Sequence, residues 1–322
     1  MIVHAFLLPI ALAWDFLIGD PRGAWHPVVL IGKLIALLEK GLLRENLTSK
    51  NKKKRGALLV VAVVGIVYTV AWAIIGATEQ LPHTAQYVVQ GLLLSFTISP
   101  RALKEAGMEI YHFLQDGNLP EARRKVGWIV GRDTDKLNEG EITRATVETV
   151  AENITDGIIS PFFFAVLGGV PLAFAYRAVN TMDSMVGYKN EKYLDFGMPA
   201  ARFDDFCNWV PARLTAMLLL LATRLCGYDV RGAYHCLKRD ASLHPSPNSG
   251  WAEATVAGAL GVQLGGLNYY FGRPSLRARM GDATKPLTAV NILETIKLMY
   301  AATLLFVGWA SLVAFTILSA WL

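Results

Sequence analysis

The stretch from Gly56 to Ala77 contains no Asp, Glu, Lys or Arg. A helix needs about 20 consecutive apolar residues to cross the hydrocarbon core of a bilayer. This stretch therefore predicts a spanning helix, and Leu298 to Leu322 predicts a second strong span. The composition agrees, because 53% of the 322 residues are hydrophobic and only 18% are charged. A chain of this kind folds in a membrane.

Other apolar segments are short or interrupted. Residues 2–18 are near the lower limit for a span and include Asp15, a carboxylate that should face the protein interior. The run from Ile158 to Ala175 contains a break at Gly168–Pro171, which favours a broken or re-entrant helix. A further apolar helix is predicted from Phe206 to Cys226. About four to six spans are expected in total.

The remaining segments fit an all-α, polytopic membrane bundle with amphipathic and re-entrant helices. An amphipathic helix is predicted from His26 to Arg44. Residues 99–157 are soluble in character and predict a cytoplasmic helical insertion within one membrane-embedded domain, 1–322. The segment from Ala257 to Leu267 is rich in small residues and indicates close helix packing.

The charge distribution bounds location and partners. The basic cluster from Arg44 to Arg55 directly precedes a span, which indicates the cytoplasmic side and explains the net charge of +5 without a nucleic-acid partner. We expect a multi-pass plasma-membrane protein whose active site faces the cytoplasm. Cys207, Cys226 and Cys236 form no CxxC pair, so free thiols are expected.

An acidic stripe marks the end of the soluble segment. Glu148, Glu152 and Asp156 fall at i, i+4 and i+8 on a predicted helix, with Thr149 and Asn153 beside them. Like charges one turn apart repel each other. A divalent cation or a set of Arg and Lys side chains should therefore lie opposite this stripe.

Two more polar clusters follow at helical spacing. One is Asn180 with Asp183, and the other is Asp204 and Asp205 with Asn208. Basic side chains are interleaved with them: Arg177, Lys189, Arg202 and Arg213. Oxygen ligands beside guanidinium groups, next to apolar sequence, favour a magnesium and phosphate site at a membrane surface. Salt bridges on solvated helix faces are the alternative.

Three weaker signals could contribute to such a site. Arg132 lies in a polar turn that could contact phosphate. Asn248 and Ser249 precede a predicted helix whose free N–H groups could hold an anion. Asp20 and His26 flank a Pro-containing turn. A simple turn, a proline-stiffened connector or a helix cap explains each of these equally well.

Six segments of the chain form a recognisable combination: GDPRGAWHPVVLIGKLI from Gly19, GWIVGRDT from Gly127, ETVAENITDGIISP from Glu148, AYRAVNTMDSMVGY from Ala175, ARFDDFCNWVPARL from Ala201 and SPNSGWAEA from Ser246. Together they resemble the adenosylcobinamide-phosphate synthase family of cobalamin biosynthesis. The resemblance runs from residue 15 to about 290. Residues 190–198 depart from the family pattern, so Asp195 is left out of the site.

The resemblance implies an integral membrane enzyme that joins aminopropanol, generally as its O-phosphate, to a propionate carboxylate of adenosylcobyric acid. ATP and Mg²⁺ are the expected cofactors, with an acyl phosphate as the simplest activated form of the carboxylate. The implied partners are the corrinoid, the amino alcohol or its phosphate, membrane lipid and other membrane enzymes of cobalamin assembly.

On this basis each candidate residue receives an expected role. Metal binding is assigned to Glu148, Glu152, Asn153, Asp156, Asn180 and Asp183. Catalysis is assigned to Asp204, Asp205 and Arg177, with one of the aspartates accepting the ammonium proton. Substrate or phosphate binding is assigned to Arg132, Arg213, Asn208, Lys189, Ser249, Asn248, Asp20 and His26.

No GxxxxGK[ST] or GxGxxG segment is present, so the residues that hold adenine are not indicated. Two other functions stay open from the residues alone. One is a magnesium-dependent intramembrane transferase, which would consume no ATP. The other is a transporter or signalling protein whose buried acids form an ion path.

Overall fold

The computed structural model describes residues 2–19, 23, 25–44 and 46–320. The protein is mostly helical, with 74% of its residues in helices and one two-stranded sheet. Its contacts group the chain into two compact units. Unit 1 contains residues 1–99, 160–208 and 307–322, and unit 2 contains residues 100–159 and 209–306. That residues 1–322 form one membrane-embedded domain stays a prediction.

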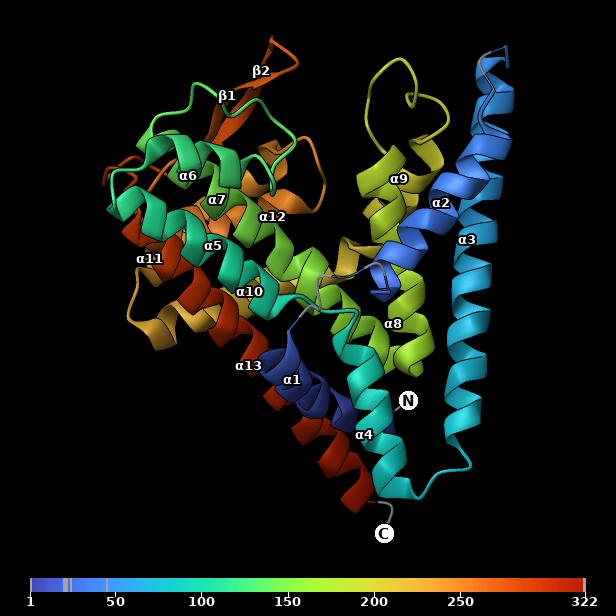
Figure 1. Cartoon of the computed structure of the whole chain (residues 1–322). Coiled ribbons are helices and arrows are strands. Elements are labelled where there is room, and N and C mark those ends of the chain that lie inside the picture. Colours follow the sequence, from blue (N-terminus) through green and yellow to red (C-terminus); the bar gives the residue numbers. More distant parts are fainter. Residues whose placement is uncertain (1, 20–22, 24, 45, 321–322) are drawn as a thin grey trace. The chain divides into compact units, whose positions relative to one another are not determined.

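Unit 1 is built around a long helix, α3 (Ser49–Thr78), which packs against α8 (Ser160–Val186), α2 (Pro27–Leu42) and α9 (Met198–Cys207) (Figure 1). Helix α1 (Leu7–Ile18) follows the short η1 (Ile2–Phe6) and packs against α4 (His83–Ser95). Asp15 is buried, as expected from its position in an apolar helix.

Unit 2 combines the predicted insertion with later parts of the chain. It begins with α5 (Pro100–Gln115), α6 (Leu119–Val126), α7 (Glu139–Ile154) and the π-helical η2 (Thr155–Ile159). It continues with α10 (Trp209–Cys226), α11 (Val230–Asp240), η3 (Ala241–Leu243) and α12 (Ser249–Leu260). The hairpin β1 (Leu264–Tyr270) and β2 (Arg273–Met280) and most of α13 (Val290–Ser319) complete it. Segment 99–157 therefore packs with residues 209–306.

Four helical segments of the described chain are long and apolar enough to cross a membrane: Ser49–Thr78, Glu139–Val186, Trp209–Cys226 and Val290–Ser319. The predicted span Gly56–Ala77 is confirmed as part of α3, and the predicted span that begins at Leu298 is confirmed in α13 as far as Ser319. Residues 321–322 of that prediction lie outside the described residues. Helix α3 begins earlier than predicted, because Thr48 caps it and the lysines of the basic cluster form its first turns. The protein is thus a polytopic helical membrane protein.

The predicted break in the run from Ile158 to Ala175 is confirmed. Gly168 and Gly169 have non-helical backbone angles inside α8, and Gly169 has φ 67° and ψ −163°. Only glycine adopts this conformation readily. Pro171 follows and cannot donate a backbone hydrogen bond. Sequence therefore gives both the position and the cause of the interruption.

The segment from Ala257 to Leu267 differs from its prediction in its second half. Close helix packing is confirmed up to Leu260, since Gly258 of α12 lies directly against the backbone of Gly232 in α11. The helix then ends at Gly261, whose left-handed conformation (φ 67°) stops it. The chain continues as an antiparallel hairpin, which the all-helical interpretation of this region missed.

Candidate active site

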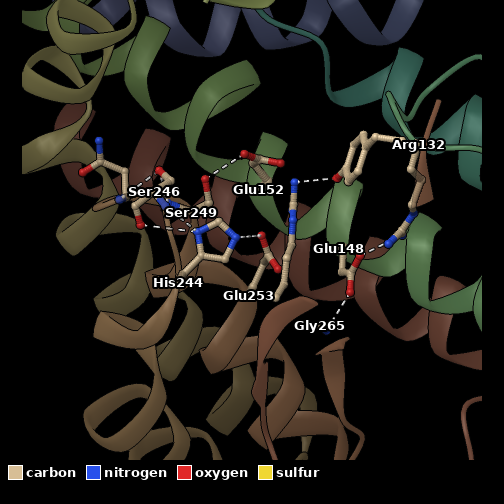
Figure 2. Close-up of polar contacts among 11 residues, drawn as sticks. Arg132, Glu148, Glu152, His244, Ser246, Ser249, Glu253 and Gly265 are labelled. Atoms are coloured by element: carbon tan, nitrogen blue, oxygen red, sulfur yellow. Dashed lines mark hydrogen bonds and ion pairs between the residues drawn. The ribbon is translucent and has the colours of Figure 1, made fainter. Parts of the chain in front are cut away.

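Unit 2 contains a polar cavity of ≈ 150 Å³. Its lining comes from the turn before α7, from α7 itself, from α12 and from the β hairpin. Several of the polar side chains at this cavity and beside it are drawn in Figure 2. Three of the sequence segments that carry the family resemblance thus meet here: GRDT, ETVAEN and SPNSGWAEA.

Helix α7 supplies two carboxylates because a capping box fixes its start. The Asn138 side chain accepts from the Glu141 amide at 2.9 Å, and the Glu141 side chain accepts from the Asn138 amide at 2.9 Å. About two and three turns after Glu141, Glu148 and Glu152 face the cavity with Asn153. The side-chain amide of Asn153 donates to the Thr149 backbone carbonyl at 2.9 Å.

Glu148 and Arg132 form a buried ion pair. Arg132 Nη2 donates to Glu148 Oε2 at 2.7 Å, and the side chains are only 5% and 9% exposed. The other Glu148 oxygen accepts from the Gly265 amide at 2.7 Å. Arg132 Nη1 also donates to Asn268 Oδ1. The charges of this predicted metal ligand and this predicted phosphate contact are therefore compensated within the protein.

Glu152 is held by a different partner. Ser249 Oγ donates to Glu152 Oε1 at 2.7 Å, as Figure 2 shows, and Glu152 is half-buried at the cavity. Asp156, the third member of the predicted stripe, is not among the residues that line this cavity. The physical reason is that α7 ends at Ile154 and the wider π-helical turn of η2 changes the phase of the side chains.

The loop before α12 brings a histidine against a buried glutamate. His244 Nε2 lies 3.6 Å from Glu253 Oε1, and these side chains are 6% and 3% exposed. Burial raises the pKa of Glu253 well above its ordinary value, and the negative charges of Glu148 and Glu152 add to this effect. Burial also lowers the pKa of His244. These pKa shifts favour the uncharged form of both side chains.

The hairpin contributes two cavity residues that sequence reasoning missed, Tyr270 and Arg277. Arg277 Nη2 donates to the Tyr270 hydroxyl at 2.8 Å. Burial lowers the pKa of Arg277, but Tyr270 and the nearby acids raise it more, so the guanidinium stays charged. Recognising the hairpin would have exposed this pair, because alternate residues of a strand share one face.

Arg213 and Asn248 lie together in unit 2. Arg213 Nη1 donates to Asn248 Oδ1 at 3.1 Å and to the Trp209 carbonyl at 2.8 Å. The guanidinium also lies 4.5 Å from the ring centroids of Trp209 and Trp251. These contacts fix the start of α12, where Ser249 is placed. The predicted phosphate role of Arg213 stays a prediction.

Unit 1 contains a second polar group, built where α8 meets α9. Asp204 is buried, and it accepts from Asn208 Nδ2 at 3.0 Å and from Asn180 Nδ2 at 3.4 Å. Asn208 Oδ1 in turn accepts from Ser160 Oγ at 2.6 Å and from the Tyr176 hydroxyl at 2.9 Å. The predicted cluster thus joins two of the resemblance segments.

The electrostatics of this group depend on a second acid. Burial, together with the negative charge of Asp183, raises the pKa of Asp204 to about 7. Burial also raises the pKa of Asp205, against the opposing effect of Arg202 and Lys189. Two carboxyl groups that share a buried site resist full ionisation unless a cation joins them.

The remaining predicted residues lie at separate places. Arg177 Nη1 lies 3.5 Å from Asn180 Oδ1 in α8, and Lys189 is exposed in the loop after it. His26 caps α2, since its Nδ1 accepts from the Val28 amide at 3.3 Å, and its ring packs edge-on against Phe96. Asp20 lies outside the described residues. The cap expected as the alternative for His26 is therefore confirmed.

Mg²⁺ binds through oxygen ligands, and these clusters contain carboxylate and amide oxygens. Among residues 2–19, 23, 25–44 and 46–320, no three His, Cys, Asp or Glu side chains form a metal-binding group. Mg²⁺ usually takes only one or two carboxylates and completes its shell with water and substrate phosphate. The Asp183 and Asp204 pair, with Asn180 beside it, fits that requirement. The metal roles of Glu148, Glu152, Asn153 and Asp156 stay predictions.

The fold and these two groups define a polytopic helical membrane protein with buried carboxylate, amide and arginine clusters. The CobD/Cbib protein family matches residues 8–299, so the chain belongs to this family of cobalamin biosynthesis proteins.

Individual relatives agree along almost the whole chain. The chain is 50% identical over 297 residues to "Cobalamin biosynthesis protein CobD" of Geobacter metallireducens, covering 92% of each protein. It is 47% identical to the CobD of Halalkalibacterium halodurans, covering 95% of this chain and 93% of the relative. It is 44% identical to "Cobalamin biosynthesis protein CbiB" of Salmonella typhi, covering 93% and 94%. No solved structure is significantly similar to the chain.

Proposed function

We propose that this chain is an ATP-dependent amide ligase of cobalamin biosynthesis. It would attach aminopropanol, or its O-phosphate, to a propionate carboxylate of adenosylcobyric acid, giving adenosylcobinamide or its phosphate. Membership in the CobD/Cbib family supports the pathway. The four apolar helices support a membrane location, which we propose to be the plasma membrane with the site facing the cytoplasm.

One observation carries the enzymatic proposal. Arg132, Glu152 and Ser249 come from three distant segments and meet at one polar group in unit 2. A transporter needs its acids along a path through the spans. A ligase instead needs charged groups gathered at one place to orient a carboxylate, an amine and phosphate oxygens. The clustered arrangement supports the ligase.

The chemistry divides into two balanced steps. The propionate carboxylate would attack the terminal phosphorus of ATP, forming an acyl phosphate and releasing ADP. The neutral amine would then attack the acyl carbon, and the phosphate would leave with the carboxyl oxygen. The ammonium must lose its proton before attack, and Asp204 or Asp205 is our candidate base.

Asp183 and Asp204 are also the residues that would hold magnesium, with Asn180 assisting. Bound magnesium neutralises phosphate charge during phosphoryl transfer. Because one carboxyl cannot serve fully in both roles at once, Asp205 is the alternative base beside it. This chain's own contribution is to hold Asp204 through Asn180 and Asn208, where the charge of Asp183 acts on it.

The test uses detergent-purified protein with magnesium, ATP, adenosylcobyric acid and aminopropanol phosphate. The corrin should gain the mass of the amine minus one water, and only when ATP is present. No gain by an intact, folded protein would overturn the ligase. A gain without ATP would favour the transferase instead.

Variants sharpen this test. Asp183→Asn should remove turnover while the protein is still expressed and inserted, because it removes one of two acids proposed to hold magnesium. Asp195→Asn is the matched control, since Asp195 pairs with Lys53 at 3.5 Å and is excluded from the proposed site. Near-normal turnover in Asp183→Asn would contradict the metal assignment.

A further inference from the structure

Arg277 is a cation without an acidic partner at the cavity of unit 2. Its one hydrogen bond within the described part of the chain goes to the Tyr270 hydroxyl at 2.8 Å, and it forms no ion pair there. The side chain is half-buried. A charged guanidinium in such a place attracts an anion, and its planar donors suit phosphate oxygens.

Glu152 is the matching anion. Its Oε1 accepts from Ser249 Oγ, and among the described residues it forms no ion pair. The other two acids of the cavity are already compensated. Glu148 is paired with Arg132 and the Gly265 amide, and Glu253 is buried beside His244. The cavity therefore offers one carboxylate and one guanidinium that form no direct ion pair with any described residue, although nearby acids act on the guanidinium.

The size of the cavity limits what can occupy it. Pockets for drug-sized ligands measure about 300–1,000 Å³, so a cavity of ≈ 150 Å³ is too small for a corrin or a whole nucleotide. A small molecule with a cationic end and an anionic end would satisfy both side chains. An amino alcohol phosphate has this chemistry.

We propose that Arg277, oriented by Tyr270, binds the phosphate of an amino alcohol phosphate, while Glu152, oriented by Ser249, binds its ammonium group. Arg277 is then the residue that selects the phosphorylated amine over the free amino alcohol. This inference rests on the proposed ligase for its substrate class, but it concerns binding alone. A nucleotide phosphate could also reach Arg277, but Glu152 would repel a polyanion that has no ammonium group.

The test measures binding of three probes to the full-length protein in detergent without corrinoid: aminopropanol phosphate, free aminopropanol and ATP. Arg277→Gln should weaken the binding of aminopropanol phosphate by about tenfold or more and leave the binding of free aminopropanol unchanged. Glu152→Gln should weaken the binding of both aminopropanol phosphate and free aminopropanol. ATP binding should be the same in wild type and Arg277→Gln. Arg273→Gln, an exposed arginine on the same strand, is the matched control and should bind as wild type.

Each outcome decides between the possibilities. Unchanged binding of aminopropanol phosphate in Arg277→Gln would overturn the proposal, and weakened ATP binding alone would assign Arg277 to the nucleotide. Tyr270→Phe should cause a smaller loss of the same kind, which keeps the test valid if Arg277→Gln does not fold. Because no ATP or corrin enters the amine measurements, the binding pattern can hold even if no ligated product forms.

Discussion

Ser249 Oγ donates a 2.7 Å hydrogen bond to Glu152 Oε1, joining the start of α12 to α7 across 97 positions of sequence. This contact holds a carboxylate whose other oxygen has no ion-pair partner in the described chain. Ser249 is itself placed by the Ser246 hydroxyl, which accepts from the Ser249 amide at 3.3 Å. The Ser249 hydroxyl thus connects the uncharged loop before α12 to the charged cavity.

Ser249→Ala should reduce the use of the amine substrate. A hydrogen bond to a charged group contributes about 1.5–3 kcal/mol, so we expect kcat/KM for the amine to fall by about tenfold or more. Steady-state kinetics with varied amine measure this effect. Ser249→Thr keeps the hydroxyl and should retain most activity. Equal losses in both variants would mean that packing, not the hydrogen bond, matters.

Breaking the ion pair between Arg132 and Glu148 should destabilise the fold. Removing one member of a buried pair leaves the other charge uncompensated and costs about 3–5 kcal/mol. Arg132→Met and Glu148→Met should each lower the melting temperature in detergent. The double variant should be less destabilised than the sum of the two. Simple additivity would show that the two side chains do not interact.

Low pH should weaken unit 2 through Asp240. Hydrogen bonds from Arg239 lower the pKa of Asp240, and the Gly281 amide donates to it at 2.8 Å. A lowered pKa means that the stabilisation is complete above the ordinary Asp value of about 3.9 and is lost as the pH falls through the folded value. Thermal unfolding at pH 7 and at progressively lower pH measures this loss.

Two variants distinguish the contributions of the buried and the exposed carboxylate that Arg239 contacts, Asp240 and Asp282. Asp240→Asn should cost about 1–3 kcal/mol at neutral pH and should flatten the acidic part of the profile. Asp282→Asn removes a partner that is 57% exposed and should cost less than about 1 kcal/mol. An unchanged pH profile in Asp240→Asn would rule out this carboxylate as the source.

Gly169→Ala should destabilise unit 1. The added Cβ would be placed in a conformation that only glycine adopts readily, at a cost of about 1–3 kcal/mol, and it would lie 3.1 Å from the His4 ring. Gly65→Ala in α3 is the control, because nothing lies near that position and alanine favours helix. Equal melting temperatures for Gly169→Ala and wild type would show that the break in α8 tolerates ordinary residues.

Much of the fold follows from sequence because apolar length and glycine placement act locally. The uncharged run from Gly56 identifies α3, and Gly168 with Pro171 identifies the break in α8. The hairpin was missed because its first strand, LGGLNYY, is rich in glycine and apolar residues that suit close helix packing equally well. Pairing with β2 is a tertiary contact, and it overrides the local pattern.

Some members of the cavity were predictable, but their pairing was not. The acids of ETVAEN were identified from spacing and the arginine of GRDT from its polar turn, yet only the structure pairs Glu148 with Arg132 and leaves Glu152 for Ser249. Arg277 was missed since it looked like one more basic residue in a basic segment. Helical spacing also placed Asp156 beside Glu152, but a π-helical turn intervenes and Asp156 is not among the residues that line this cavity.

The central claim is that ATP activates a corrin carboxylate as an acyl phosphate before the amine attacks. Adenosylcobyric acid labelled with ¹⁸O in its propionate carboxylate tests this directly when the purified protein turns over with magnesium, ATP and the amine. The account predicts one ¹⁸O atom in the inorganic phosphate for each amide formed. Amide formation with unlabelled phosphate, or with the label in AMP, would contradict it.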